Sequence, residues 1–475
     1  MGGTRLRKLQ ESQSNDVSSL PLRQSVAKAK SSLLIKPSFR ISETSPINGD
    51  RSAGSAEVAF NPDDNEYLVI WESNGLTELN AVKDIYGRRI SGASNERIGI
   101  DFRISSQSDT DKHHSANGPK VVYNTTAHEY LVVWNGSGLV DSPDKFFEAY
   151  GQRLSRTGKA IGSIFRISFT TDLGKVNTSF VRSSSQVDIA WNSSNNEYMV
   201  IWQGMGEAED VVKMEIYGQR LKANGELLAK YFRISHTSDQ GINFHASAPA
   251  IAYNSRDNQY LVVWSGGFKN ESKVEVWGRG LSAGGVSPTT EFRVSQVTDI
   301  GANRRAGSPR VVYANANNEY FVVFQANGVQ GEDNAEVNEI FGQRIDAATL
   351  TQIGANDFRV SNTVDPGNRA NKPAVAFNNV AKEYLVIWRN IRQNAPSEVF
   401  GQRIGSDGTE IETDFQISNI TAVGKDRSVN RSSLTHHTGT GDYFVVWQGN
   451  GLPQANAAKI TEIFGQQLGL IPSKR

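Results

Sequence analysis

The sequence predicts an all-β fold, a seven-bladed β-propeller with four antiparallel strands in each blade. Three observations lead to this prediction: short strand-like phrases recur seven times, the repeat is 59 to 68 residues long, and no segment has a helical pattern. Repeats of several short strands at such a period are typical of solenoids and propellers, because one unit alone cannot bury its apolar face. Four short strands per repeat favour the propeller.

Each repeat contains four predicted strands joined in the same order. The first ends at Asn, as in 119–124 and 249–254. The second is Glu-Tyr-Leu-Val-Val-Trp or a variant, rich in β-branched and aromatic residues. The third resembles Ile-Tyr-Gly-Gln-Arg-Leu, and the fourth is Phe-Arg-Ile-Ser. Short polar turns separate the first pair and the last pair, with Asn224-Gly225 as a hairpin signal. The seven second strands begin at Glu66, Glu129, Glu197, Gln259, Glu319, Glu383 and Asp442.

The order of the phrases predicts a closed ring. The chain begins with an isolated fourth strand, Phe39–Ser42, and its last repeat lacks one. If Phe39–Ser42 pairs beside the last third strand, 464–468, it closes the ring and covers the exposed edges at the seam. An open solenoid would need polar caps instead. The predicted organisation is a basic polar N-terminal arm at 1–38, the propeller at 39–470 and a C-terminal tail at 471–475.

Charged residues repeat with the strands. An acidic residue opens each third strand, and Arg follows Phe in every fourth strand except at Gln416. Acid and base on antiparallel neighbours predict cross-strand ion pairs within the blades; the alternative is a ring of ion sites. Asp recurs in the turn after the fourth strand, and an Asx turn explains it without calcium, which needs more converging oxygens. The strand aromatic residues are interpreted as core rather than as a sugar platform.

The composition excludes several classes of function. Fifty basic and fifty acidic residues give a net charge of zero, which argues against a nucleic-acid partner. The chain contains no run of 18 apolar residues, so we expect no membrane insertion. The absence of Cys excludes disulfides. The N-terminus lacks a signal-peptide pattern, so we expect synthesis in the cytoplasm with release in an assembly, or a cell-surface location reached by a signal-independent route.

No pattern of catalytic residues is apparent. The sequence contains no H-E-x-x-H, G-x-S-x-G or P-loop motif, and its seven histidines are scattered. The sequence therefore predicts no catalytic residue, no cofactor and no metal site.

A binding face is predicted from the lengths of the connections. The long second-to-third and fourth-to-first segments emerge on one face of a propeller, and long variable loops on a rigid scaffold are a usual seat of binding. The N-terminal arm, with seven basic residues against two acidic ones, is a second candidate. The predicted partner-binding residues are Arg5, Arg7, Lys8, Arg23, Lys28, Lys30, Glu207, Asp210, Glu332, Asp333, Arg389 and Arg392.

The repeated phrases Asn-Glu-Tyr-Leu-Val-Val-Trp, Ile-Tyr-Gly-Gln-Arg-Leu and Phe-Arg-Ile-Ser resemble the tandem-repeat β-propeller regions of large bacterial, including cyanobacterial, surface and secreted proteins. The resemblance covers about residues 39–468 and implies no catalytic residue. The leading hypothesis is a non-enzymatic interaction or structural propeller, not an enzyme, that binds a protein partner or its own copies within a larger assembly such as a virus particle or injection machine. The alternatives are a glycan-binding propeller at a cell surface, and a hydrolase or lyase with its site at the mouth of the channel.

Overall fold

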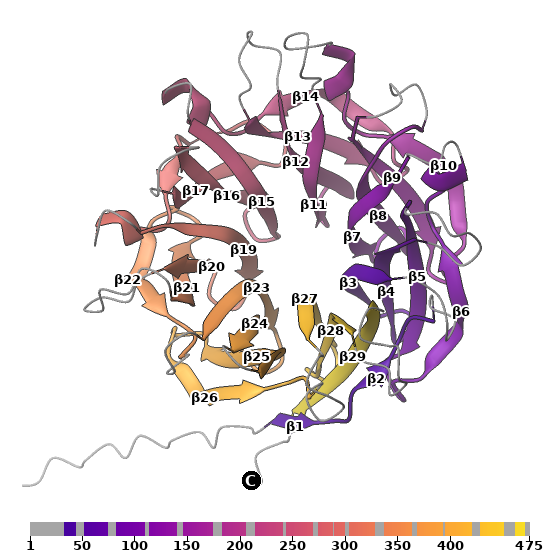
Figure 1. Ribbon diagram of the computed structural model, residues 1–475. Helices are drawn as coiled ribbons and strands as arrows, with labels where there is room; N and C mark the ends of the chain where they lie inside the picture. Colours follow the sequence, from indigo (N-terminus) through magenta and orange to yellow (C-terminus); the bar gives the residue numbers. More distant parts are fainter. Residues whose placement is uncertain are drawn as a thin grey trace, which may run out of the picture.

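The computed structural model confirms the seven-bladed β-propeller (Figure 1). The blades surround a central axis, and the first strand of each blade is the innermost. No helix among the described residues is long and apolar enough to cross a membrane. The residues that the structure describes are 33–43, 52–74, 82–109, 114–139, 146–173, 183–205, 214–240, 244–268, 274–287, 289–299, 304–327, 337–362, 368–392, 395–419, 428–450 and 461–470.

Blades one to six each consist of four antiparallel strands paired in chain order. Blade one contains β3 (Ala53–Asn61), β4 (Glu66–Ser73), β5 (Asp84–Ser91) and β6 (Arg97–Arg103), and blade two contains β7 (Ala116–Asn124), β8 (Glu129–Gly136), β9 (Glu148–Ser155) and β10 (Ala160–Arg166). Blade three contains β11 (Ser184–Asn192), β12 (Glu197–Met205), β13 (Met214–Lys222) and β14 (Leu227–Arg233), and blade four contains β15 (Phe244–Asn254), β16 (Gln259–Phe268), β17 (Val274–Ser282) and β18 (Phe292–Arg293). Blade five contains β19 (Ala306–Ala314), β20 (Glu319–Asn327), β21 (Asn338–Asp346) and β22 (Gln352–Arg359), and blade six contains β23 (Arg369–Asn378), β24 (Glu383–Arg392), β25 (Ala395–Gly405) and β26 (Glu410–Gln416). Four 3-10 turns follow fourth strands at Gln107–Asp109, Thr170–Leu173, Thr237–Gln240 and Val297–Asp299.

The seventh blade joins the two ends of the chain, as predicted. It contains β27 (Val429–His436), β28 (Tyr443–Asn450) and β29 (Thr461–Leu470), with β2 (Phe39–Arg40) paired to β29. Phe39 lies opposite Gly465, so the N-terminal strand occupies the place of the missing fourth strand. The closing segment is longer than predicted, because β1 (Leu33–Ile35) also pairs with the end of β29.

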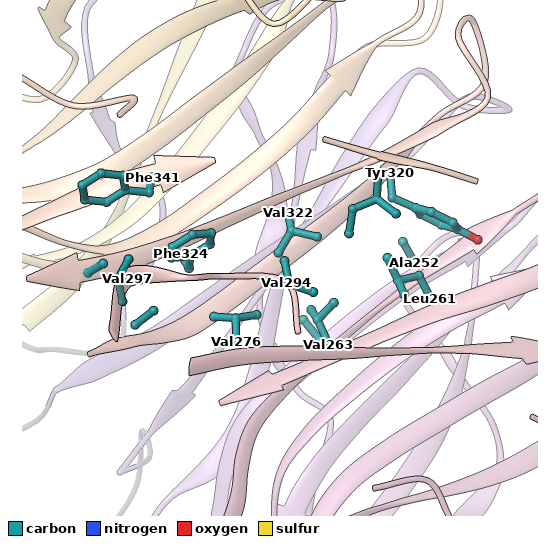
Figure 2. Packing of buried hydrophobic residues seen from close by; sticks show 14 of the residues in the cluster. Ala252, Leu261, Val263, Val276, Val294, Val297, Tyr320, Val322, Phe324 and Phe341 are labelled. Carbon is teal, nitrogen blue, oxygen red and sulfur yellow. The ribbon is translucent and has the colours of Figure 1, made fainter. Parts of the chain in front are cut away.

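The core is divided into seven apolar layers between neighbouring blades. Figure 2 shows the layer between blades four and five, where Val263 and Val276 face Val322 and Phe324. The second-strand aromatic residues, six Trp and Phe324, are fully buried, so the prediction that they belong to the core is confirmed. Alternation along each second strand sends residues to the layers on both sides of its blade, which explains why these strands are apolar along most of their length.

The predicted ion pairs hold third and fourth strands together within the blades. Arg359, for example, lies 2.6 Å from Glu339, and Ser361 donates to the same carboxylate while accepting the N–H of Ile340 at 2.8 Å. The recurring turn Asp adds a second partner for the same Arg, so its role is structural in the described blades. The Arg–acid pairs are Arg40–Glu462, Arg103–Asp84, Arg166–Glu148, Arg233–Glu215, Arg293–Glu275 and Arg359–Glu339. The Asp–Arg pairs are Asp109–Arg103, Asp172–Arg166, Asp239–Arg233 and Asp299–Arg293.

Every innermost strand contains a register shift near its start, which is typical of a β-bulge. In blade six the shift lies between Asn371 and Ala374, and Lys372 has a φ of 54°. Five other blades place a residue with positive φ at this bulge position: Ser55, Gly118, Gln186, Ala248 and Ser308. The repeated bulge brings the bulge residue and the residue two positions later to matching heights around the axis.

Candidate functional site

Three basic side chains gather where blades six and seven meet the axis. Lys372 is the bulge residue of β23, Arg389 lies near the end of β24, and Arg431 lies near the start of β27. In the register of β23 and β24, Arg389 stands opposite Asn371, the neighbour of Lys372. The start of a first strand and the end of a second strand lie on the face with the long connections. These three residues, the cationic cluster, therefore occupy the face predicted to be the working one.

Arg389 departs from a bonding pattern that the other blades share. The residue after the second-strand aromatic position usually accepts a hydrogen bond from a backbone N–H in the bulge of the next blade. Arg389 has no acceptor on its side chain, and it donates instead to Ser397 Oγ at 3.0 Å. The accepting side chains, with the donor residue and the distance, are Glu72 (Gly118, 2.8 Å), Asn135 (Val187, 3.2 Å), Gln203 (Ala248, 3.4 Å), Ser265 (Ser308, 3.0 Å) and Gln325 (Lys372, 3.2 Å).

The electrostatics of the cationic cluster are unbalanced. Burial, together with the positive charges of Arg431 and Arg389, lowers the pKa of Lys372 to about 8. Burial also lowers the pKa of Arg389, whose Nε is buried without a hydrogen-bond partner among the described residues. Lys372 donates to the Asn430 side chain, a neutral acceptor. Within the described ranges, none of the three forms an ion pair with a carboxylate, so the cluster has unused capacity for an anion.

A second group of charged side chains lies one step further along the innermost strands. The residues two positions after the bulge include Glu57, Lys120, Asp188 and Arg310, which come from blades one, two, three and five. Lys120 forms an ion pair with Glu57 across a blade junction, and Ser433 Oγ donates to Glu57 at 2.8 Å.

Asp188 connects this second group across the axis. It accepts the N–H of Ile251 from the next blade at 3.1 Å. Burial raises the pKa of Asp188, and the positive charges of Lys120 and Arg310 oppose that rise. The charges that act on Asp188 therefore come from blades two and five as well as from its own surroundings. We call Glu57, Lys120, Asp188, Arg310 and Ser433 the axial cluster.

The two clusters together give the axis a positive balance. They contain five basic side chains and two acidic ones, a net charge of +3 when all are ionised, in a chain whose total charge is zero. A concentration of one sign of charge attracts ligands of the opposite sign. The described residues contain no group of three or more His, Asp or Glu side chains suited to hold a metal ion.

Two of the predicted partner-binding residues lie in the described part of the chain. Arg389 belongs to the cationic cluster. Arg392 lies aside from it, stacked over the Phe400 ring at 5.1 Å and bonded to Gln416 Oε1 at 3.2 Å. The remaining predicted residues lie outside the described residues: Arg5, Arg7, Lys8, Arg23, Lys28, Lys30, Glu207, Asp210, Glu332 and Asp333.

Sequence reasoning missed Lys372 and Arg431 because it looked in the loops, while both residues lie on strands. A comparison of the repeats position by position could have found Lys372, which stands where other blades have Ser, Gly, Gln or Ala.

Comparison with known proteins identifies similar propellers among solved structures. The polysaccharide lyase Uly1 matches with a TM-score of 0.52 and 9% identity, over 88% of this chain and 90% of that chain. A PL25 ulvan lyase bound to -[GlcA(1-4)Rha3S]- matches with a TM-score of 0.52 and 8% identity, over 87% and 94%. At this identity the similarity establishes a shared fold. No protein-family model matches the sequence, and no curated protein matches it significantly.

These comparisons correct two predictions. The sequence-based hypothesis of a non-enzymatic interaction propeller, and the statement that the chain is not an enzyme, are both contradicted, because Uly1 and the PL25 ulvan lyase, which share this fold, are polysaccharide lyases. The reasoning failed because the repeated residues describe only the scaffold. It took the absence of a repeated catalytic motif as the absence of a site, whereas a propeller site can be assembled from residues that differ between blades.

Proposed function

We propose that this protein is a lyase that cleaves an acidic, uronate-containing polysaccharide at the long-connection end of the axis. The observation that carries the proposal is the cationic cluster: three basic side chains without a carboxylate partner among the described residues, one of them a lysine whose pKa is about 8. This arrangement supplies both a binding site for a carboxylate and a group that can accept a proton near neutral pH.

The proposed reaction is a β-elimination. Arg389 and Arg431 bind the uronate carboxylate and stabilise the negative charge that spreads into it when the neighbouring C5–H bond breaks. Neutral Lys372 accepts that proton. The C4–O bond then breaks with its electron pair leaving on oxygen, and a C4=C5 double bond forms. The Lys372 ammonium returns its proton to the leaving oxygen, which restores the neutral amine. The step consumes no water and needs no oxidant, so side chains that bind charge and transfer a proton are sufficient.

The comparisons support the substrate class without assigning the residues. Two propellers that superpose on most of this chain are polysaccharide lyases, and the ligand of one contains glucuronate. The assignment to Lys372, Arg389 and Arg431 rests on their position, their burial and their lack of anionic partners. The net charge of +3 on the two clusters favours an acidic chain over a neutral one.

The test is a lyase assay with matched variants. The full chain is incubated with ulvan, alginate, polygalacturonate or glucuronan, with starch as the neutral control, and the conjugated C4=C5 product is followed by ultraviolet absorbance. Lys372→Ser and Arg389→Gln install residues that other blades already have at these positions, Ser55 and Gln325, so the fold is expected to tolerate them. Each is expected to lower kcat by about 100-fold or more.

Lys382→Asn is the control, because Lys382 is an exposed residue of the same blade in the turn at the opposite end of β23. This variant should keep full activity. Absorbance that rises equally in the wild type and in both cluster variants would contradict the assignment. Absence of product from every acidic polysaccharide would refute the proposed function.

A further inference from the structure

A pocket of about 480 Å³ lies on the opposite face of the ring, between blades one and two. Asp63, from the turn between β3 and β4, and His128, from the turn between β7 and β8, line it together with Ser155, Arg156 and Ile161 from blade two. This volume is within the usual range for small-molecule sites, roughly 300–1,000 Å³. The pocket is separate from the cationic cluster, since it is built from the short turns at the other end of the strands.

The polar groups of this pocket are held in place across the blade junction. His128 Nδ1 lies 2.7 Å from Asp63 Oδ2, and the Tyr123 hydroxyl donates to the same carboxylate. These two hydrogen bonds lower the pKa of Asp63, which is therefore ionised at neutral pH. Arg156 is held more loosely, 3.5 Å from Asp64, and its side chain is 54% exposed. The His128 side chain is 61% exposed, so its other ring nitrogen is accessible.

This junction differs from the equivalent junctions at several positions at once. The His128 position is Asn in four blades, and in each of them the Asn side-chain oxygen accepts a hydrogen bond from a neighbouring side chain: Asn65, Asn196, Asn258 and Asn318. Arg156 stands where other blades have small residues: Gly92, Ala223, Ala283, Ala347 and Ser406. Asp63 stands where blade three has Ser194, which accepts the Tyr253 hydroxyl at 2.7 Å. The scaffold bond to tyrosine is retained, while a carboxylate, an imidazole and a guanidinium are added around one pocket.

We infer that this pocket binds a neutral saccharide. Carboxylate oxygens accept hydrogen bonds from sugar hydroxyls, and the guanidinium and serine donate to them, while Ile161 supplies an apolar wall for a sugar ring. An acidic sugar fits less well, because Asp63 and Asp64 outweigh Arg156 when the imidazole is neutral. The pocket therefore differs in ligand class from the positively charged axis, and it provides a second contact with a glycan independently of any cleavage.

The experiment is ligand-observed saturation-transfer NMR on the full chain, with cellobiose, lactose, maltose and mannobiose as separate probes and trigalacturonate as the acidic probe. At least one neutral disaccharide is expected to bind. His128→Asn and Arg156→Ala should each raise its Kd by about tenfold or more. Arg256→Ala, which removes an exposed arginine from the corresponding turn of blade four, should leave the Kd unchanged. Circular dichroism of each variant establishes that it is folded.

The outcomes separate this inference from the proposed lyase function. The inference is overturned if no neutral disaccharide binds, if binding is the same in both pocket variants, or if trigalacturonate rather than a neutral sugar depends on His128. Lys372→Ser must leave disaccharide binding unchanged; if it abolishes binding, the sugar occupies the axis and the inference is wrong. A chain that binds the disaccharide without cleaving any uronate polymer would refute the lyase proposal alone.

Discussion

Replacing two half-buried carboxylates by amides is expected to stabilise this propeller. Asp357 and Asp414 precede the Phe of the fourth strand in blades five and six, and each accepts a backbone N–H from the preceding blade: Gln296 at 2.6 Å and Asn362 at 2.7 Å. Their other carboxylate oxygens are buried without a hydrogen-bond partner among the described residues. Burial raises the pKa of each from 3.8 to about 6.

The sign of the effect follows from linkage. Since the folded-state pKa exceeds the unfolded one, the folded state binds more protons between pH 4 and pH 6, and stability falls as the pH rises through this range. A shift of about two units corresponds to roughly 3 kcal/mol for each group. Both residues are partly exposed, so we reduce this to about 1 kcal/mol each at pH 8. Asp357→Asn with Asp414→Asn should therefore add about 2 kcal/mol to the free energy of unfolding, because the amide oxygen still accepts the interblade hydrogen bond.

Urea unfolding, followed by the fluorescence of the buried tryptophans at several pH values, measures this free energy. The double variant should show the gain at pH 8 and a flatter pH dependence between pH 4 and 6. The matched control is Asp101→Asn at the same position of blade one. Asp101 lies 2.6 Å from buried Arg88, so that change should cost about 3 kcal/mol. If the double variant is no more stable than the wild type at pH 8, desolvation of these carboxylates is not the dominant effect and the reasoning fails.

Two further predictions concern Lys372 and His437. For the proposed lyase, kcat/KM should rise about tenfold per pH unit below pH 8 and level off above it, because only neutral Lys372 accepts a proton. Arg389→Gln removes one of the charges that lower the pKa of Lys372, so this variant should move the inflection to higher pH. A profile that is flat or falls between pH 7 and 9 would exclude Lys372 as the base. His437→Asn should change the free energy of unfolding by less than about 0.5 kcal/mol, whereas His437→Ala should lower it by about 1–2 kcal/mol in the same urea experiment. An equal loss in both variants would contradict the role of His437 as a hydrogen-bonding replacement for the Asn of the repeat.

The fold could be predicted from the sequence because seven copies of the repeat carry the same information. The strands, the closing N-terminal strand and the Arg–acid pairs all follow from spacing and alternation, which need only local geometry. The sites could not be predicted in this way. Lys372 and Arg431 lie 59 positions apart in the chain, and Asp63 and His128 lie 65 apart. Each pair meets only because adjacent blades place equivalent positions side by side.

Binding in the variable loops stays a prediction, and the two proposed sites lie elsewhere. The three residues of the cationic cluster lie on strands β23, β24 and β27. The pocket at Asp63 and His128 is lined largely by short turns. In the sequence, a strand residue of this fold is read as scaffold because its neighbours match the repeat. Whether it has another role depends on which hydrogen bonds its side chain makes, and that is visible only in the assembled ring.

A departure from the repeat therefore indicates function only when it abandons the scaffold bond at that position. His437 replaces the Asn that ends other first strands, yet its Nδ1 accepts the N–H groups of Gly439 and Thr440 at 3.0 and 3.1 Å, as Asn124 Oδ1 does in its own turn. Its Nε2 donates to Asn65 in the next blade at 2.6 Å, as Asn124 Nδ2 does to Asn196, so the scaffold role is preserved with a different side chain. Arg389 does the opposite: it gives up the interblade hydrogen bond and leaves a buried guanidinium nitrogen without a partner in the described structure. Arg220 also has a buried Nε without a partner, but its guanidinium keeps the carboxylate of Glu197 at 2.7 Å. Arg389 has no carboxylate partner among the described residues, and this difference is the reason that we propose an anionic ligand for it.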